Sequence, residues 1–541
     1  MCESQMARPV TAWRSLGKGS WHAPSAKLVA ICLLGSCVVL LLPIAGTVAA
    51  GRHAATSHSG AVAGTGRSAG ARLQVGRAHV SGKREFRRSA VSRTLARHRD
   101  QRAAKHARRH GQPSPRSVPA EVSGQSLSSI PHRSQSMPPG QLLPPPVPRQ
   151  ILVLLDQDQP QALGRALART YRLDRISSAP VPLLGARAEL MRVREERSLD
   201  AVLAALQGDT RVRSAQPNQR YLQTGGASSR YLQSAEAQRP SSEQSNRRRP
   251  DPPIPQYGPR KLRLPEAHQL ARGRNVVIAV IDSAVDTGHP DLQDAVSRSF
   301  NATGRPDGMP DYHGTAVAGI IRSHGLVDGA APESKILAVR AFRAGGERAF
   351  PETTTHILIT AVDWAVRNGA RVLNMSFIGA HDPALQQVLH AANQKGVVVV
   401  AAAGNGGPGA PPVYPGAYRG VIAVTAVDEA DRRYEHANRG SYVAVAAPGV
   451  DILAPVERGG YAYVSGTSFA AAYVSGIAAL LLERDPNLDP KSVADLLATA
   501  AEDLGPVGRD DDFGAGRVDA YASLKLLAHD LAAKRGELAQ P

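Results

Sequence analysis

The sequence predicts an α/β protein whose large C-terminal domain holds a mostly parallel sheet with helices on both faces, in three layers. A small α+β domain and a basic N-terminal region without a core are predicted to precede it. Three observations support this organisation. Short apolar runs alternate with helical spacing over residues 255–530, and the stretch 150–224 repeats this alternation on a smaller scale. Positive charge gathers before residue 150.

The first 150 residues carry almost all of the net charge of the chain. They contain 22 of the 65 Lys and Arg residues but only 4 of the 46 Asp and Glu residues, which makes up +18 of the net +19. The basic excess therefore belongs to a tail. One interpretation is a solvated, self-repelling arm, and another is an arm held on an anionic membrane or cell-wall surface. No nucleic-acid partner is expected, because the tail has almost no aromatic side chains that could stack on bases.

An uncharged apolar run covers residues 28–50 and follows a basic stretch, residues 1–27. The run is long enough to cross the hydrocarbon core of a bilayer, so 28–50 is predicted to be a transmembrane anchor, with 1–27 in the cytoplasm. Its end, Val48-Ala49-Ala50, also has the small-residue pattern of a signal-peptidase site, which would make 1–27 the n-region of a signal peptide. Either alternative predicts an extracytoplasmic protein, secreted or anchored in the cell envelope. All three cysteines precede residue 40, so the folded part is expected to be stable without disulfides.

Two segments have the composition of linkers. Residues 51–149 are rich in Arg, Ser, Gly and Pro and end in a proline-rich run, so a disordered basic linker is predicted there. Residues 225–254 are rich in Ser, Gln, Arg and Pro and are predicted to form a second, exposed linker.

The segment 150–224 has the pattern of a small domain of the ferredoxin-like kind, a split βαβ arrangement. Its apolar runs and helical spacings predict strands at Ile151–Leu155, Ala188–Val193 and Val212–Tyr221, and helices at Gln161–Tyr171 and Leu199–Leu206.

The segment 255–530 has continuous apolar strands separated by helices, the pattern of a parallel sheet that is buried on both faces. The predicted strands are Asn275–Ile281, Ile336–Ala341, Val372–Ser376, Val397–Ala403 and Val421–Val427. The predicted helices are Pro351–Arg367, Pro383–Gln394 and Ser468–Glu483.

Three residue types that serve acyl transfer occur in this domain in the order Asp282, His313, Ser468, each among small residues. Alone, each has an ordinary structural interpretation: Asp282 could cap a turn, His313 could be a structural histidine, and Ser468 could be a helix N-cap. Together they suggest an acid, a base and a nucleophile at the carboxyl ends of parallel strands.

The motifs around these residues resemble those of the subtilisin-like serine proteases, over about residues 255–525. They read Val-Ile-Asp-Ser-Ala-Val-Asp-Thr-Gly-His-Pro-Asp-Leu at 280–292, His-Gly-Thr at 313–315, Ala-Ala-Gly-Asn at 402–405 and Gly-Thr-Ser-Phe-Ala at 466–470. The resemblance implies a subtilisin-like fold and serine endopeptidase activity.

The resemblance also implies roles for individual residues. Ser468 would be the nucleophile, His313 the general base and acid, and Asp282 the carboxylate that orients the histidine. Asn405 would donate its side-chain amide to the oxyanion. For substrate binding, the implied residues are Ser376 and Phe377 on a strand edge that binds extended peptide, and Val413 at the floor of a pocket for the residue before the cut.

The small domain 150–224 resembles the inhibitory propeptide of the same family in size and position, and would act as an intramolecular inhibitor. Polypeptides would be the substrates. The resemblance implies no cofactor for catalysis, and the histidines show no metal-ligand spacing. A structural calcium ion stays open, because Asp291 matches one of the family's ligands while the segment Arg322–Ala331 is shorter than the family's calcium loop.

Two rival functions remain at this stage. Ile378 falls where the family usually has a glycine beside the substrate, so the domain could be a catalytically inactive peptide-binding pseudoprotease. Alternatively, the chain could be a surface scaffold or adhesin whose functional part is the basic tail.

Overall fold

The computed structural model describes residues 143–223, 225–232, 256–306, 309–343 and 351–536, with the backbone alone for 227–232. The predicted segments 1–27 and 28–50, and most of 51–149, lie outside these residues. Within the described ranges, no helix has both the length and the apolar character that a membrane crossing requires.

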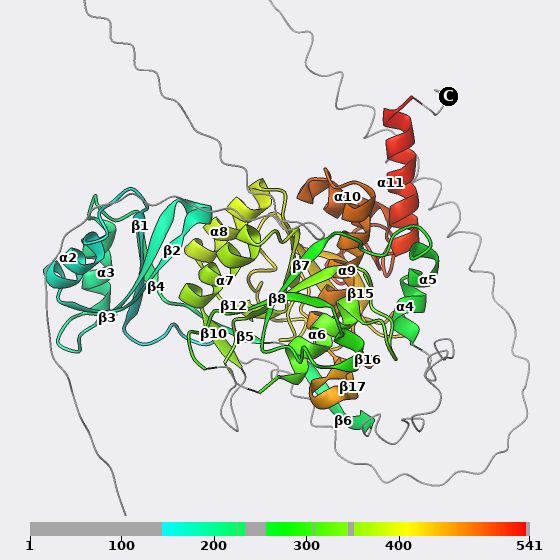
Figure 1. The fold of residues 1–541 in the computed structure, drawn as a ribbon, viewed down its shortest axis with the longest axis horizontal. Helices are drawn as coiled ribbons and strands as arrows, with labels where there is room; N and C mark the ends of the chain where they lie inside the picture. Colours follow the sequence, from blue (N-terminus) through cyan, green and yellow to red (C-terminus); the bar gives the residue numbers. More distant parts are fainter. Residues whose placement is uncertain (1–142, 224, 233–255, 307–308, 344–350, 537–541) are drawn as a thin grey trace, which may run out of the picture. The chain divides into compact units, whose positions relative to one another are not determined.

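The small domain has the predicted ferredoxin-like arrangement. Its elements are β1 (Gln150–Asp156), α2 (Leu163–Thr170), β2 (Leu173–Val181), β3 (Ala186–Val193), α3 (Leu199–Gln207) and β4 (Ser214–Pro217). The sheet has the order β2-β3-β1-β4 with antiparallel pairs, and α2 and α3 lie on one side of it (Figure 1). Alternate residues of β1 serve the two faces: Ile151, Val153 and Leu155 pack with the two helices, while Leu152 and Leu154 belong to a second core cluster with the large domain.

Strand β2 was not predicted from the sequence, because its pattern is polar and contains Pro180. The strand lies at the edge of its sheet, where a proline needs no partner on its outer side. On its inner side, β2 is joined to β3 by an ion pair between Arg175 and the buried Glu189.

The large domain is built on seven parallel strands in the order β15-β14-β13-β11-β7-β9-β8. They are β7 (Val277–Asp282), β8 (Val296–Asn301), β9 (Lys335–Arg340), β11 (Val372–Met375), β13 (Val398–Ala402), β14 (Val421–Val427) and β15 (Val443–Pro448). All six neighbouring pairs run parallel, as predicted for a sheet with continuous apolar strands. The two strands that were not predicted, β8 and β15, are the edges.

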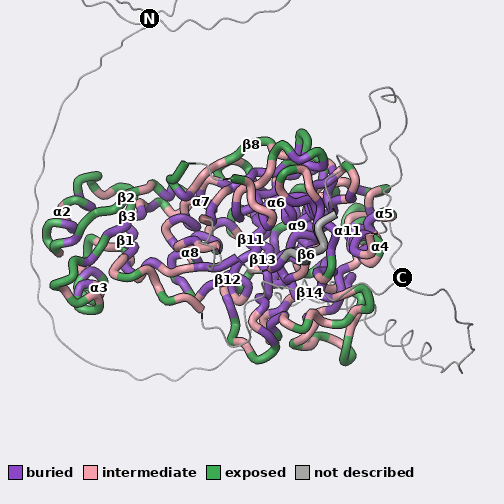
Figure 2. The backbone as a smooth tube through the Cα atoms, turned by 90° about the horizontal axis from the view of Figure 1, so that it is seen from below, coloured by how far each residue is buried: buried purple, intermediate pink, exposed green. Residues whose placement is uncertain are grey.

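Helices cover both faces of this sheet, which gives the predicted three layers. Strand β7 shows the alternation: Ile278 and Val280 pack in the core with α6 (Tyr312–Arg322) and α9 (Thr467–Arg484). Ala279 and Ile281 pack in the core with α7 (Thr355–Arg367) and α8 (Pro383–Gln394). Buried backbone accordingly gathers around α6, α9, β11 and β13 (Figure 2). The other helices are α4 (Tyr257–Lys261), α5 (Leu264–Ala267), α10 (Pro490–Ala500) and α11 (Ala520–Lys534).

Two short sheets join the large domain to chain segments that precede it in the sequence. In one, β5 (Arg220–Gln223) lies between β10 (Glu352–Thr354) and β12 (Phe377–Gly379) and is antiparallel to both. In the other, β6 (Gly226–Leu232) pairs with β17 (Gly460–Ser465), which forms a hairpin with β16 (Ile452–Val456).

The two short sheets correct the sequence analysis at two places. The single closing strand predicted over 212–221 is divided into β4 and β5, which belong to different sheets. The exposed linker predicted from residue 225 begins instead with strand β6. Its Gly- and Ser-rich sequence has little strand preference of its own, and pairing with β17 gives it strand structure.

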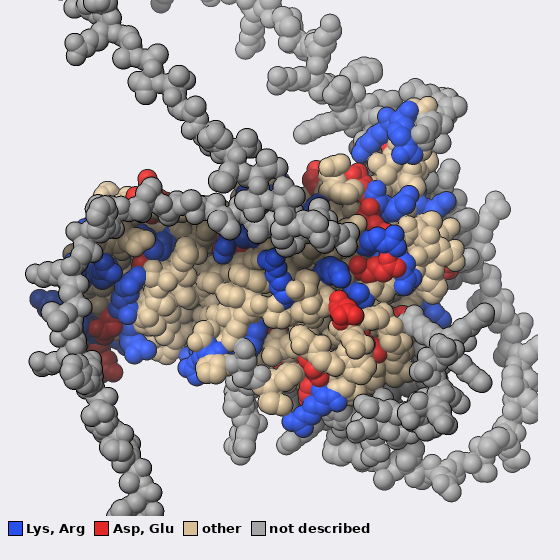
Figure 3. All heavy atoms as spheres, in the orientation of Figure 1, with Lys and Arg blue, Asp and Glu red and all other residues tan. Residues whose placement is uncertain are grey.

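The surface of the described residues carries both signs of charge. In the view of Figure 3, Lys and Arg side chains lie among Asp and Glu side chains. This distribution agrees with residues 151–541, which contain 43 Lys and Arg against 42 Asp and Glu.

Candidate active site

Asp282 and His313 form a direct pair at the carboxyl edge of the parallel sheet. Asp282 is the last residue of β7 and is fully buried. Its Oδ1 accepts hydrogen bonds from the backbone N–H of Ser283 at 2.7 Å and from Nδ1 of His313 at 2.8 Å. Because the carboxylate accepts, the hydrogen of the imidazole lies on Nδ1, and Nε2 is left to act as a base.

His313 is held in the first turn of α6 by its neighbours. The side chain of Asp311, the N-cap of this helix, accepts from the backbone N–H of His313 at 3.0 Å. Gly314 allows the helix to lie close to β7, since a Cβ there would be 2.7 Å from the carbonyl oxygen of Ser283. The glycine of the His-Gly-Thr patch therefore fixes the spacing between the base and its carboxylate.

Ser468 is the second residue of α9 and is fully buried. Its Oγ donates to the carbonyl oxygen of Ser376 at 3.3 Å, and Ser376 Oγ donates to the carbonyl oxygen of Ser468 at 3.0 Å. The next residue, Phe469, packs against the ring of His313 with a centroid distance of 5.4 Å. These contacts bring the helix end that carries the serine next to the Asp–His pair.

Asn405 presents a buried amide beside the start of α9. Its Oδ1 accepts from the backbone N–H of Thr467 at 3.1 Å and from Thr467 Oγ1 at 2.8 Å. Its Nδ2 is buried and has no partner among the described residues. The two bonds to Thr467 aim this N–H₂ group at the N-terminus of α9, where an oxyanion would be stabilised.

The three residues predicted for substrate binding lie near β5, at different places. Phe377 is in β12, and its ring meets that of Tyr221 edge-on at 5.8 Å. Ser376 precedes β12 and exchanges hydrogen bonds with Ser468. Val413 packs in a small cluster with Ile378 and Leu222.

Residues on either side of position 224 lie at this site. Gln223, the last residue of β5, donates from Nε2 to Asp282 Oδ1, and the same amide nitrogen lies 3.3 Å from His313 Nδ1. Tyr312 donates from its hydroxyl to the carbonyl oxygen of Gly225 at 3.1 Å. A Cβ on Gly225 would be 3.5 Å from His313 Nε2, and one on Gly466 would be 2.8 Å from the Cα of Gly225. Gln223 and Gly225 therefore lie against the Asp–His pair.

The sequence analysis missed several residues of this site. Asp311 had a usable signal, since an Asp two residues before a helical His suggests an N-cap. Thr467 lies in the motif Gly-Thr-Ser-Phe-Ala at 466–470, but no feature of the neighbouring sequence indicates that it orients Asn405. Gln223 gave no signal, because its position depends on how β5 adds to β12.

Asp291, the residue that matches a calcium ligand of the family, accepts hydrogen bonds from the protein on both carboxylate oxygens. Asp291 Oδ1 accepts from the backbone N–H of Leu326 at 2.8 Å and from the hydroxyl of Tyr461 at 2.7 Å, and Oδ2 accepts from Val327 N–H at 2.9 Å. Burial and Asp291 raise the pKa of Tyr461, so its hydroxyl is a donor. A calcium site needs converging acceptors, and within the described ranges no group of three His, Cys, Asp or Glu residues could hold a metal. The residues around Asp291 thus do not fit a calcium ion.

A parallel α/β sheet with a buried Asp–His pair and a serine at a helix N-terminus, all at its carboxyl edge, is the arrangement of an α/β serine hydrolase. The profile of the subtilase family matches residues 273–516. Thermitase of Thermoactinomyces vulgaris is 35% identical over 280 residues, which cover 50% of this chain and 96% of thermitase. Subtilisin of Bacillus pumilus is 38% identical over 259 residues, which cover 46% of this chain and 92% of that protein. The chain belongs to the subtilase family of serine-type endopeptidases.

Two further relatives match over smaller shares of their own length. The thermophilic serine proteinase of Bacillus sp. (strain AK1) is 39% identical over 240 residues, which cover 43% of this chain and 58% of that protein. The crystal structure of fervidolysin from Fervidobacterium pennivorans, a keratinolytic enzyme related to subtilisin, has a TM-score of 0.60 and 24% identity. The fervidolysin match covers 74% of this chain and 64% of fervidolysin. The likeness of fold therefore covers a larger share of this chain than the likeness of sequence.

Proposed function

We propose that this chain is a serine endopeptidase in which Asp282, His313 and Ser468 carry out acyl transfer and Asn405 stabilises the oxyanion. The observation that carries the proposal is the 2.8 Å pair of His313 Nδ1 with buried Asp282, next to the helix end that presents Ser468. Membership of the subtilase family supports the class of reaction.

The reaction follows from these positions in two steps. Ser468 Oγ attacks the carbonyl carbon of the scissile bond while His313 Nε2 takes its proton. Asp282 holds the ring and stabilises the imidazolium that forms, and His313 then gives the proton to the leaving amine. In the second step a water attacks the acyl-enzyme, with His313 again as the base, and the carboxylic acid and free serine are released.

The developing negative charge has two donors available. Asn405 Nδ2 is a buried amide without another partner among the described residues, and the backbone N–H groups at the start of α9 lie at the positive end of that helix. Both are already oriented before the reaction, so neither needs to reorganise when the oxyanion forms.

We predict that Asn405→Ala lowers kcat by about 10²–10³-fold and leaves KM nearly unchanged, the size measured for this loss in subtilisin, a relative of this chain. The reason is that the amide would contact the oxyanion and not the ground-state substrate. Steady-state kinetics on a peptide substrate measure the effect, and Asn487→Ala, in the loop after α9, is the control. An increase in KM at unchanged kcat would place Asn405 in substrate binding instead.

The small domain, residues 150–224, is proposed to be the propeptide of this enzyme and its intramolecular inhibitor. Its C-terminal continuation supports this role. Strand β5 extends β12 and β10 on one side of the site, and β6 extends β17 on the other. An extended chain that adds a strand on both sides of a nucleophile occupies the whole substrate cleft.

The register of this segment suggests where the enzyme cuts itself. Gln223 lies on the Asp–His pair, and Gly225 lies against His313 and Gly466, so the scissile bond is proposed to join Thr224 to Gly225. Ile378 and Val413 pack together beside Leu222, and the resemblance to the family puts Val413 at the floor of the pocket for the residue before the cut. The proposed preference is therefore for a small residue there, as Thr224 is.

Intact-mass analysis and N-terminal sequencing of the purified protein test this proposal. We expect a mature form that begins at Gly225 and a separate small domain, while the Ser468→Ala protein stays uncut at this bond. A wild-type protein cut only within Arg247–Arg249 would show that the enzyme does not cleave the bond that lies in its own cleft.

We also propose that the enzyme acts outside the cytoplasm, with the basic tail against an anionic membrane or cell-wall surface. The apolar run 28–50 and the charge of the first 150 residues support this, and both lie at or beyond the edge of the described residues. Fractionation of producing cells tests it: the protein should be found in the medium or the envelope, and recovery in the cytosol would contradict it.

Metal chelation is predicted to leave the thermal stability of the folded domains unchanged. The donors from Leu326, Val327 and Tyr461 already satisfy the carboxylate of Asp291, so no cation is required there. A calcium site at a free calcium concentration of roughly 1,000 times its Kd would add ~4 kcal/mol to the free energy of unfolding. Loss of that calcium ion would lower Tm by roughly 8 °C.

Differential scanning calorimetry with and without EDTA makes the comparison. Asp291→Ala is the matched variant, and its Tm should fall in both conditions because two buried donors and one half-buried donor lose their acceptor. A Tm that falls on chelation in the parent but not in Asp291→Ala would show that Asp291 does bind a cation.

A further inference from the structure

The carboxylate of Asp382 is the most heavily bonded buried acid near the cleft. It is the N-cap of α8, it is fully buried, and its Oδ1 accepts from the backbone N–H groups of Ala384 at 3.0 Å and Leu385 at 3.1 Å. Oδ1 also accepts from Gln216 Nε2 at 2.6 Å. Oδ2 accepts from the hydroxyl of Tyr221 at 3.0 Å and from Thr355 Oγ1 at 2.5 Å.

Two of these five donors, Gln216 and Tyr221, precede the proposed cut. They would leave with the small domain, and Asp382 would keep Thr355 and the two N–H groups of its own helix. Oδ2 would then have one partner in place of two. A buried carboxylate oxygen that loses a donor is costly, so the open site favours a ligand that supplies another donor.

The side chain of Tyr221 lies in a pocket shaped for an aromatic ring. It is fully buried, and Phe377 packs edge-on against it at 5.8 Å. Gly379 forms another wall, where a Cβ would be 2.3 Å from the ring of Tyr221. Burial and the charge of Asp382 raise the pKa of Tyr221 well above its ordinary value, so its hydroxyl stays protonated and donates.

Helix capping alone does not explain an aspartate at this position. A single side-chain oxygen caps α8, and Ser or Asn would serve equally well. The second oxygen of Asp382 points to Tyr221 instead. Tyr418 fixes the backbone of Asp382 by accepting from its N–H at 2.8 Å and donating to its carbonyl oxygen at 2.9 Å.

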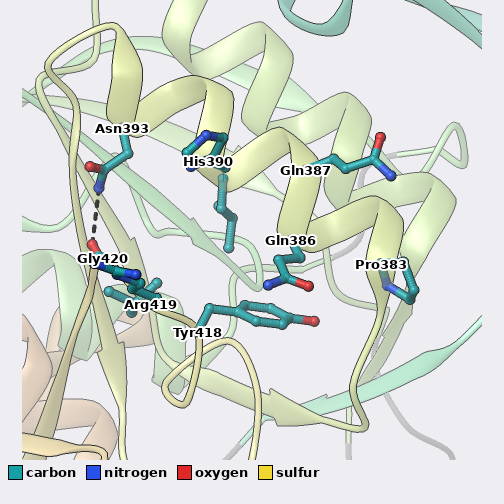
Figure 4. Close-up of a pocket in the computed structure, with 10 residues that line it drawn as sticks. Pro383, Gln386, Gln387, His390, Asn393, Tyr418, Arg419 and Gly420 are labelled. Atoms are coloured by element: carbon teal, nitrogen blue, oxygen red, sulfur yellow. Dashed lines mark hydrogen bonds between the residues drawn. The ribbon is translucent and has the colours of Figure 1, made fainter. Parts of the chain in front are cut away.

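A separate pocket beside Tyr418 is not the pocket that holds the ring of Tyr221, since Tyr221 does not line it. It is lined by α8 residues such as Gln386 and His390 and by the loop of Arg419 and Gly420 (Figure 4). Figure 4 shows Tyr418 along its floor, with the hydroxyl directed toward Pro383. Tyr418 thus lines this pocket with its ring, while its hydroxyl holds the backbone of Asp382.

We propose that Asp382 determines specificity: it selects substrates with a tyrosine four residues before the cut, at the position that Tyr221 occupies. This inference rests on the proposed function and on the cut between Thr224 and Gly225. The ring fills the pocket of Phe377 and Gly379, and the hydroxyl hydrogen bonds to Asp382 Oδ2. Phenylalanine fills the same pocket but leaves Oδ2 one donor short.

Two peptides that differ by one oxygen atom test the proposal on the mature enzyme. Both contain Leu-Gln-Thr-Gly-Gly-Ala, preceded by Tyr in one and by Phe in the other. The expected kcat/KM is roughly 10- to 100-fold higher for the Tyr peptide, the range for a hydrogen bond to a charged group. In Asp382→Asn and Asp382→Ser, which both keep an N-cap residue, the ratio should fall to near one.

Asp489→Asn is the matched control, because Asp489 is the N-cap of α10 and accepts from Ser492 N–H without contact to the cleft. Its Tyr-to-Phe ratio should equal that of the parent. Equal rates for the two peptides in the parent would overturn this inference and leave the proposed function standing. An enzyme that cleaves neither peptide, nor casein, would overturn both.

Discussion

Ser468→Ala is expected to abolish peptide hydrolysis and to leave the chain uncut between Thr224 and Gly225. The fall in kcat should be roughly 10⁶-fold, the size measured on subtilisin, a relative of this chain, when its nucleophile is removed. Alanine fits the position, because Ser468 is the second residue of a helix and its hydroxyl bond to the carbonyl oxygen of Ser376 is long, at 3.3 Å. The fold should therefore survive, and the loss should be chemical.

Turnover of casein and gel analysis of the purified protein measure this effect, with Ser441→Ala, an exposed serine, as the control. A fluorophosphonate probe adds a test that does not depend on a substrate. The mature parent should be labelled at Ser468, and the Ser468→Ala protein should not. A parent that resists the probe would favour the inactive peptide-binding protein that Ile378 suggested.

Asp282→Asn is expected to lower kcat by about 10⁴-fold, the size seen for the same change in another Asp-His-Ser protease. The carboxylate accepts from His313 Nδ1 at 2.8 Å and so keeps Nε2 unprotonated. An amide in its place can turn its N–H₂ group toward Nδ1, which favours the tautomer with hydrogen on Nε2. That nitrogen could then no longer take the proton of Ser468.

Kinetics on the same substrate measure the loss, and Tm shows whether the fold is intact. Asp294→Asn is the control, since Asp294 is exposed and has φ +57°, which asparagine tolerates. A loss that is matched by unfolding, or a fall of less than tenfold, would contradict the role proposed for Asp282.

The order of elements in the large domain was predictable because its central strands are apolar throughout. Two layers of helices enclose the strands β7, β11, β13 and β14. Both faces of these strands are therefore buried, which explains their apolar composition. Helix α8 was predicted with its observed bounds, since Asp382 and Pro383 are ordinary signals for a helix start. The edge strand β8 was not predicted because it is largely polar and exposed. The edge strand β15 was not predicted either, although it is apolar and buried, so its edge position does not explain the difference.

The residues of the candidate site that lie in sequence motifs were predictable. The residues that reach the site only through strand pairing were not. Asp282, His313, Ser468 and Asn405 lie within short patterns whose small residues allow close approach, as Gly314 shows. Gln223 and Tyr221 reach the site only because β5 is inserted between β10 and β12. No local periodicity in the sequence predicts that insertion. The pairing of β6 with β17 has no local signal either, so the sequence predicts a linker there.

Strand β6 has a consequence for the timing of activation. Breaking the chain after Thr224 would cut one covalent tether, but each flank would keep its own backbone pairing, β5 with β12 and β6 with β17. The freshly made amino terminus would stay attached to the enzyme and lie over the side of the groove that receives leaving groups. Full activity should then appear later than bond cleavage. Its rate should be set by the dissociation of β5 from β12 and of β6 from β17, and not by the reaction of Ser468.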